Sequence, residues 1–127
     1  MSRSLLPSSR RAVALALLAG ACTAFGQPAK PSNGVLAGAG GMTLYTFDRD
    51  TAGAGQSACN GQCAALWPPL KAQATDQASG AWSLVTREDG SKQWAYKGKP
   101  LYYYSNDKQA GDKTGDNFRD VWHAAKE

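Results

Sequence analysis

The sequence has little of the chemistry that most enzymes and metal proteins need. Its 127 residues include one histidine, His123, and three cysteines, of which Cys59 and Cys63 lie outside the N-terminal segment. Structural zinc sites take four ligands, so these three side chains are too few. The chain has no Gly-x-Ser-x-Gly elbow for serine hydrolysis. Its glycine run at 38–41 lacks the final glycine and the following helix of a dinucleotide site. Because no catalytic constellation is matched, we predict a protein that is not an enzyme and needs no cofactor.

Acidic residues are absent before Asp48, and the first 26 residues have the three parts of a secretory signal. Arginines at positions 3, 10 and 11 make the start positive. An apolar run of eight residues follows at 12–19, and small residues lead to Gly26. This combination is typical of a cleaved export signal, and the run is too short for a bilayer, which needs about 20 apolar residues. We predict a signal peptide at 1–26 and a periplasmic, cell-envelope or secreted location.

Two variants of this export signal stay open. Cys22 follows Ala-Gly-Ala, which is similar to a lipobox, so the cysteine is either lipidated or removed by cleavage near Gly26. The pair Arg10-Arg11 loosely matches the twin-arginine signal, so both export routes are compatible with the sequence. The polar, proline-containing stretch 27–33 indicates a flexible tether. Residues 34–127 are then the folded domain.

An excess of positive charge is absent from the part that remains after export. The whole chain has a formal net charge of +4 at pH 7, but three of its arginines belong to the signal. The remainder has 11 Lys and Arg against 10 Asp and Glu. Nucleic-acid binding needs a basic patch, and the sequence shows none. We therefore predict no nucleic-acid partner, and contact with a membrane only through a lipid on Cys22.

An internal repeat is the most informative feature that is present. The pattern Gly-x-x-Leu-Tyr-x-aromatic-x-x-Asp occurs at residues 41–50 and again at 98–107, an offset of 57 positions. Such self-similarity indicates a duplicated supersecondary unit. Each copy follows a glycine-containing turn, as the second strand of a hairpin does. We predict a mainly β fold, a small antiparallel domain of two related hairpin repeats.

Flanking segments complete the predicted fold. We expect strands at 35–37 and 92–96, which pair with the first and the second motif strand. A strand at 82–87 extends the second hairpin to a three-strand meander over 82–104, and a strand at 121–124 closes the fold. One short helix is expected at 59–66, because Pro68-Pro69 disfavours helix in the residue before it.

Cys59 and Cys63 form an even pair in a compartment that we expect to be oxidising. A disulfide between them, stapling the short helix, is therefore the first interpretation. The alternative is a copper-binding or thiol-redox protein, in which the two thiolates and His123 make a soft three-ligand site. A count of free thiols and of bound metal distinguishes the two hypotheses.

The repeated motif supplies the remaining candidate residues: Tyr45, Phe47, Asp50, Tyr102, Tyr104 and Asp107. Each motif aspartate follows a strand, where a carboxylate can accept the N–H groups of a turn. Calcium binding by the acidic loops is the alternative for these carboxylates. The motif aromatics alternate on an extended strand, so they either fill the core or form an exposed face for a glycan or peptide.

Together these features resemble a known bacterial group. The two motif copies, the Cys59-x-x-x-Cys63 pair with the following Leu-Trp-Pro-Pro, and the Val-Trp-His at 121–123 are similar to the bacterial predicted lipoproteins with a repeated Tyr-x-aromatic-x-x-Asp motif, also called the secreted repeat of unknown function. The resemblance covers residues 34–125. It implies an envelope location and a repeat architecture, with no established activity to transfer. We predict a non-enzymatic binding or structural module whose partner is an unidentified ligand or protein of the envelope.

Overall fold

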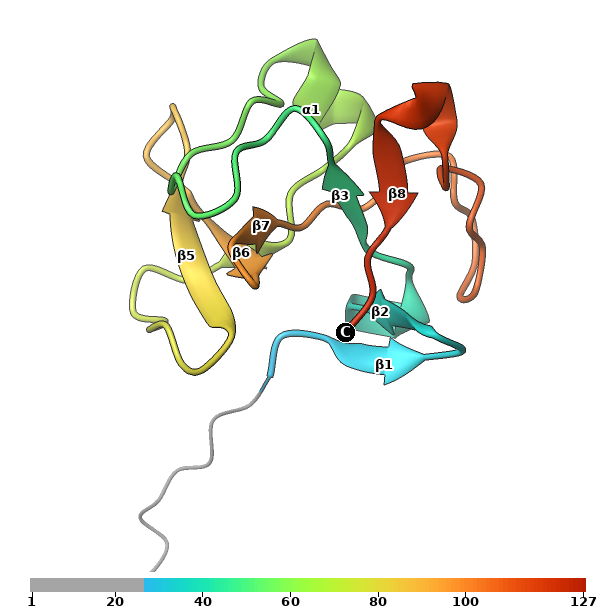
Figure 1. The fold of residues 1–127 in the computed structure, drawn as a ribbon, viewed down its shortest axis with the longest axis horizontal. Helices are drawn as coiled ribbons and strands as arrows, with labels where there is room; N and C mark the ends of the chain where they lie inside the picture. The colour runs from blue at the N-terminus through green and yellow to red at the C-terminus, as the bar shows by residue number, and fades with distance from the viewer. Residues whose placement is uncertain (1–26) are drawn as a thin grey trace, which may run out of the picture.

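Short strands and one short helix make up residues 27–127, the part of the chain that the computed structural model describes (Figure 1). The elements are β1 (Lys30–Ser32), β2 (Val35–Ala37), β3 (Tyr45–Phe47), α1 (Gln62–Leu66), β4 (Lys71–Ala72), β5 (Trp82–Thr86), β6 (Lys92–Tyr96), β7 (Lys99–Pro100) and β8 (Trp122–Ala124), with 3-10 turns η2 (Ala39–Gly41) and η3 (Phe118–Asp120). The predicted class, mainly β with small antiparallel sheets and two repeats, is confirmed. Within 27–127 no helix is long and apolar enough to cross a membrane. The expectations for the signal peptide, Cys22 and the export route fall outside the described residues.

The strands of this described part form small antiparallel sheets. β1 pairs with β2, and β3 pairs with β8. β6 has β5 along one edge and both β4 and β7 along the other. The meander predicted over 82–104 is therefore present as β5, β6 and β7. Its β6–β7 turn consists of Lys97 and Gly98, with φ of 52° and 83°, the left-handed pair that a two-residue hairpin requires.

The first motif strand has a different partner from the one predicted. We expected β3 to pair with β2, but that hairpin is limited to a bridge between Ala37 and Thr43 and a hydrogen bond from Leu44 N to Leu36 O (2.9 Å). In an antiparallel hairpin β3 would pair with the start of β2. Because β2 begins directly after a turn, too few residues remain there to pair with β3. The backbone groups of β3 need another partner, and β8 supplies it along the whole strand (Figure 1).

The second motif strand and the helix are shorter than predicted. β7 ends at Pro100, and Tyr102 beyond it makes isolated bridges to Tyr45 and Pro69. The helix begins at Gln62 because Gly61 before it has φ of 60°, a left-handed conformation that interrupts a right-handed helix.

The prediction of a flexible tether at 27–33 is wrong for residues 30–32. Ala29 is buried at 3% exposure, and Lys30–Ser32 form β1. The turn between β1 and β2 is Asn33-Gly34, with φ of 52° and 87°, and Asn-Gly is a strong hairpin signal that the prediction did not use. The ordered domain therefore begins before residue 34.

Two clusters of buried side chains form the core. One contains Ala29, Leu36, Leu44, Leu70, Trp82, Trp94, Leu101 and Ala125, and the other Val35, Tyr45, Cys59, Trp67, Tyr102, Tyr104, Trp122 and Ala124. Each cluster takes residues from both repeats. The two repeats therefore share one interior and are not independent units.

Candidate functional site

The two motif tyrosines meet at the centre of the fold. Tyr45 N donates to Tyr102 O (2.8 Å), and Tyr102 N donates to Tyr45 O (3.0 Å). Both tyrosines are fully buried. An approximate two-fold relation between the repeats produces this kind of reciprocal bonding between equivalent residues.

Each motif tyrosine also bonds the aspartate of the other repeat. Tyr45 Oη donates to Asp107 Oδ2 (2.7 Å), and Tyr102 Oη donates to Asp50 Oδ2 (2.6 Å). The second carboxylate oxygens accept backbone N–H groups, from Ala58 to Asp50 (2.6 Å) and from Thr114 to Asp107 (3.0 Å). The polar atoms of the motif therefore join the two repeats to one another.

Burial controls the ionisation of these groups. The pKa values of Tyr45 and Tyr102 lie well above the ordinary tyrosine value, first because burial disfavours the phenolate and second because each hydroxyl donates to a carboxylate. The pKa of Asp50 is also raised by burial, although its bonds from Tyr102 and Ala58 and the charge of Arg87 oppose the rise. The tyrosines are thus neutral hydrogen-bond donors over the physiological pH range.

A column of four aromatic rings crosses the interface between the repeats. Phe47 stacks on Trp122 (4.1 Å between centroids), Trp122 on Trp67 (3.8 Å), and Trp67 on Tyr104 (4.0 Å). Tyr45 packs edge-on against Trp67, as Tyr102 does against Trp122. Tyr104 is buried, so the motif aromatics mainly fill the core.

The two repeats exchange the segments that follow their motifs. Ser105 N bonds Leu66 O (2.8 Å), as Asp48 N bonds Val121 O (2.7 Å). The segment from Leu66 to Pro69 therefore lies along the second motif, just as β8 lies along the first. Neither repeat has a complete set of partners without the other.

The cysteines form the predicted disulfide near the helix. Cys59 and Cys63 are bonded, and Cys59 is fully buried. The Arg87 guanidinium holds this loop from inside, because its Nη2 donates to Cys59 O (2.6 Å) and to Asn60 Oδ1 (3.2 Å). Its Nη1 donates to Gln93 Oε1 (2.6 Å).

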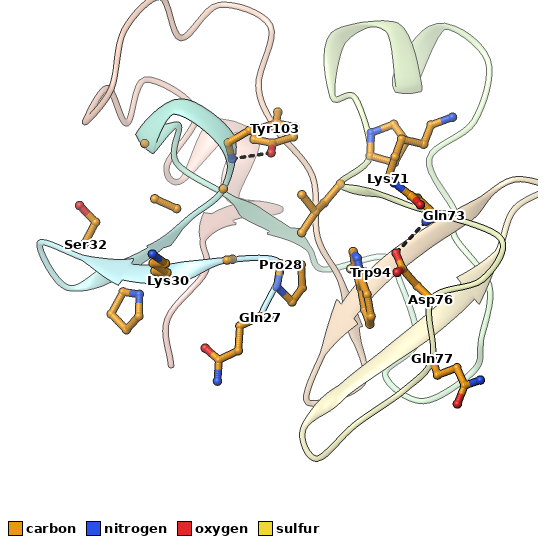
Figure 2. Close-up of a pocket in the computed structure, with 18 of the residues that line it drawn as sticks. Gln27, Pro28, Lys30, Ser32, Lys71, Gln73, Asp76, Gln77, Trp94 and Tyr103 are labelled. Carbon is orange, nitrogen blue, oxygen red and sulfur yellow. Dashed lines mark hydrogen bonds between the residues drawn. The ribbon is translucent and has the colours of Figure 1, made fainter. Parts of the chain in front are cut away.

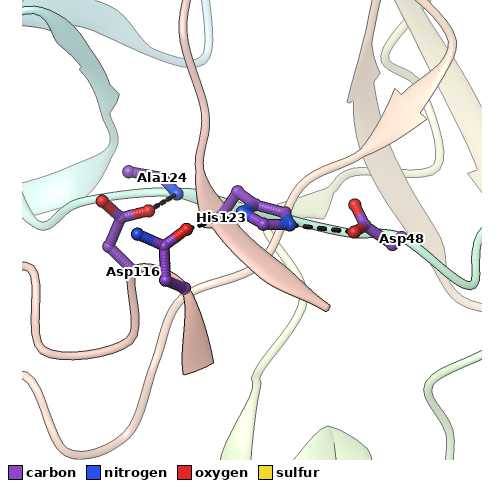
Figure 3. Close-up of polar contacts among 5 residues, drawn as sticks. Asp48, Asp116, His123 and Ala124 are labelled. Carbon is purple, nitrogen blue, oxygen red and sulfur yellow. Dashed lines mark hydrogen bonds and ion pairs between the residues drawn. The ribbon is translucent and has the colours of Figure 1, made fainter. Parts of the chain in front are cut away.

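The copper alternative receives no support from this arrangement. It required thiolates at Cys59 and Cys63 together with His123, but both sulfurs are in the disulfide. Among residues 27–127 no three His, Cys, Asp or Glu side chains are grouped to hold a metal, which also leaves the calcium alternative without a site. His123 instead lies on β8 between Asp48 and Asn117 (Figure 3).

A family comparison agrees with this two-part construction. A family model described as a secreted repeat of unknown function matches residues 29–71 and 83–126. The chain belongs to this family. No curated protein and no solved structure matches it. Each match within the secreted repeat family contains one motif strand and the exchanged strand after it, and the first match begins at Ala29, the first buried residue.

The secreted repeat domain has a surface groove of about 1130 Å³ between the β1–β2 hairpin and β4 with the loop after it (Figure 2). Lys30 and Ser32 lie on one wall, and Lys71 and Gln73 on the other. Trp94 lies between them, with little exposed surface. The groove has an amphipathic lining and no cluster of catalytic side chains.

Tyr103 borders the same groove from the face opposite the other motif aromatics. Its hydroxyl accepts the Ala39 N–H (3.0 Å), and its ring lies against Gly38, where an added Cβ would be 2.4 Å from the hydroxyl. This tyrosine is a fixed wall of the groove. Strand alternation predicted its separation from Tyr102 and Tyr104, but not the groove itself.

A smaller pocket of about 450 Å³ lies between the β6–β7 turn and β8. Lys97, Lys99 and Lys126 line it together with His123, and we call it the lysine pocket. His123 Nε2 pairs with Asp48 Oδ2 (2.8 Å), and its Nδ1 lies 3.0 Å from Asn117 Oδ1 (Figure 3). Both ring nitrogens of His123 are therefore already within hydrogen-bond distance of a neighbouring side-chain oxygen.

The repeat pattern indicates the motif residues but not the side chains that join them to the rest of the fold. Trp67 and Trp122 are 55 positions apart, outside the window in which the repeat is visible at an offset of 57. Arg87 looks like an ordinary strand-end residue in the sequence, yet it is buried. The lysine pocket combines three distant segments, and no local pattern marks it.

Proposed function

We propose that this chain is a non-enzymatic binding module of the bacterial cell envelope, exported by its N-terminal signal. The observation that carries the proposal is the use of the motif. Hydrogen bonds between the repeats occupy the hydroxyls of Tyr45 and Tyr102 and the carboxylates of Asp50 and Asp107. These buried groups stabilise the fold and are not available to a ligand, so a ligand would bind at the surface of the domain.

The groove is the surface that fits this role. Its volume exceeds the 300–1,000 Å³ of ordinary small-molecule sites, and it opens on the surface of the domain, so it suits a large ligand of the envelope. Its walls come from two different sheets, fixed by β1 on one side and β4 on the other. Apolar surface from Pro31 and polar side chains such as Gln73 and Asp76 would contact such a ligand together.

The location is the second part of the proposal. The family is one of secreted repeats, and the predicted signal at 1–26 and the Cys59–Cys63 disulfide both suit an oxidising compartment outside the cytoplasm. We propose periplasmic or surface exposure, with attachment to the membrane when Cys22 is lipidated. Cell fractionation with a mass spectrum of the mature N-terminus tests this part, and a full-length protein in the cytoplasm contradicts it.

Retention on washed cell envelopes tests the binding role. The purified protein should sediment with the envelopes, and the double variant Lys30→Glu/Lys71→Glu, with one change on each wall, should stay in the supernatant. The matched control is Lys108→Glu/Lys113→Glu, because these exposed lysines line neither hollow. Equal retention of both variants contradicts the groove. Repeating the assay with detergent-extracted cell walls identifies whether the polymer or the membrane holds the protein.

A further inference from the structure

We propose that the lysine pocket is an anion site that binds a phosphate group. This site is separate from the groove, so it does not depend on the binding role proposed there. Its volume of about 450 Å³ is within the range of small-ligand sites.

Three lysines line the lysine pocket without a carboxylate partner, and the ammonium of Lys97 lies over the ring of Tyr96, 5.4 Å from its centroid. Among residues 27–127 the one side-chain ion pair within 4.0 Å joins His123 to Asp48. Lys97, Lys99 and Lys126 line the pocket, and none of them has a carboxylate within that distance. Lysine binds phosphate as a point charge, and three of them around one hollow suit a compact anion with more than one negative charge.

The two acidic residues of the lysine pocket are already engaged. Asp48 pairs with His123, and Asp116 Oδ1 accepts the backbone N–H of Ala124 (2.9 Å). Both bonds are drawn in Figure 3. The lining has three lysines against these two carboxylates, so an incoming anion meets a net positive charge. The amide of Asn117, whose oxygen faces His123, has its nitrogen available as a neutral donor.

Lys97 adopts a backbone conformation that is unfavourable for lysine. Its φ is 52°, in the left-handed region where a residue with a side chain is strained. The equivalent position of the first repeat is Gly40, with φ of 69°, and the β1–β2 turn has Asn33, which tolerates this region better than lysine. Retained backbone strain of this kind clusters at functional sites. A lysine here costs stability and supplies a charge at the rim of the pocket.

The test is a titration of the purified protein with inorganic phosphate, followed by amide NMR shifts and compared with chloride at equal ionic strength. Saturable shifts are expected at Lys97, Gly98 and Lys126. The double variant Lys97→Asn/Lys99→Gln should bind roughly tenfold more weakly. The control Lys108→Gln/Lys113→Gln removes the same charge from exposed positions outside the pocket and should bind like the unchanged protein.

Two results would overturn the proposal: no saturable shift with phosphate, or equal weakening in the control, which would reduce the effect to net charge. Lys97→Asn alone should raise the melting temperature by roughly 2–4 °C while it weakens phosphate binding, since asparagine relieves the strained turn. Flotation with phosphatidylglycerol and phosphatidylcholine vesicles then identifies the source. Retention by the first alone assigns a lipid headgroup, and phosphate binding without retention assigns a free phosphate compound.

Discussion

Trp67 and Trp122 stack face to face across the two repeats, with ring centroids 3.8 Å apart and an angle of 1° between the ring planes. Each is the residue at which an exchanged strand reaches the core. Phe47 and Tyr104 extend the stack on either side. The two indoles therefore form the centre of the contact between the repeats.

Removing one indole should destabilise both repeats at once. Trp122 is 4% exposed, and its loss leaves a cavity between Phe47 and Trp67. We expect Trp122→Ala to lower the free energy of unfolding by about 3–5 kcal/mol in urea denaturation. Leu66→Ala, at the most exposed large apolar side chain (53%), should change it by less than about 0.5 kcal/mol. A loss below about 1 kcal/mol for Trp122→Ala would contradict the central role of the stack.

The bond between Tyr45 and Asp107 should appear as a coupling energy. Tyr45→Phe leaves a buried carboxylate oxygen without its donor, so we expect a loss of about 1–3 kcal/mol of unfolding free energy. A double-mutant cycle with Asp107→Asn should give a coupling of at least about 0.5 kcal/mol. The cycle of Tyr45→Phe with Asp89→Asn, which shares no bond with Tyr45, should be additive. Additivity in both cycles would mean that the bond contributes nothing.

High pH should destabilise the fold through its buried tyrosines. The pKa values of Tyr45 and Tyr102 are raised in the folded state, so their contribution is complete below the ordinary tyrosine pKa near 10 and is lost as pH rises above it. Each should lower the unfolding free energy by about 1.4 kcal/mol per pH unit there. Urea denaturation between pH 8 and about 11 measures the slope. Tyr45→Phe should roughly halve it, and an unchanged slope would refute this assignment.

Two glycines with similar backbone angles should respond differently to alanine. Gly90 and Gly98 have φ of 87° and 83°, so both substitutions carry a backbone cost of about 1–2 kcal/mol. A Cβ on Gly90 meets nothing within 4 Å, whereas one on Gly98 would lie 2.9 Å from the backbone nitrogen of Gly53. Gly98→Ala should therefore reduce stability more than Gly90→Ala in thermal denaturation. Equal losses would show that the loop at Gly53 moves freely.

The disulfide should be structural, with a modest effect. Its loop is short, since four positions separate Cys59 and Cys63, and the chain-entropy model gives about 2 kcal/mol for such a loop. Reduction should lower the unfolding free energy by about that amount and release two thiols. Protein prepared without reductant should show neither free thiol nor bound copper. Bound copper with reduced cysteines would instead revive the metal hypothesis.

Local sequence signals predicted the parts of this fold that depend on neighbouring residues. The Asp89-Gly90 turn located β5 and β6, and the repeat located the strand containing Tyr45. The even pair of cysteines, in a compartment expected to be oxidising, predicted the disulfide. In each case the physical cause lies within a few residues of the signal, as in turn geometry or side-chain alternation.

Partner choice could not be predicted in the same way. The pairing of β3 with β8 depends on residues more than 70 positions apart, and on β2 being too short to serve. The bond from Tyr45 to Asp107 depends on the same exchange, because nothing in one motif copy indicates that its tyrosine reaches the aspartate of the other. A search for tryptophan after each motif, without a fixed offset, would have found the stack.

The exchange of strands sets the order in which the protein can mature. Until β8 is available, β3 has no ladder partner and Trp67 has no indole to stack on, so the first repeat stays open while the second is still being delivered. Contacts this distant in sequence form late and slowly. A chain crossing a membrane from its N-terminus would thus remain translocation-competent until β8 has emerged, and would lock only then.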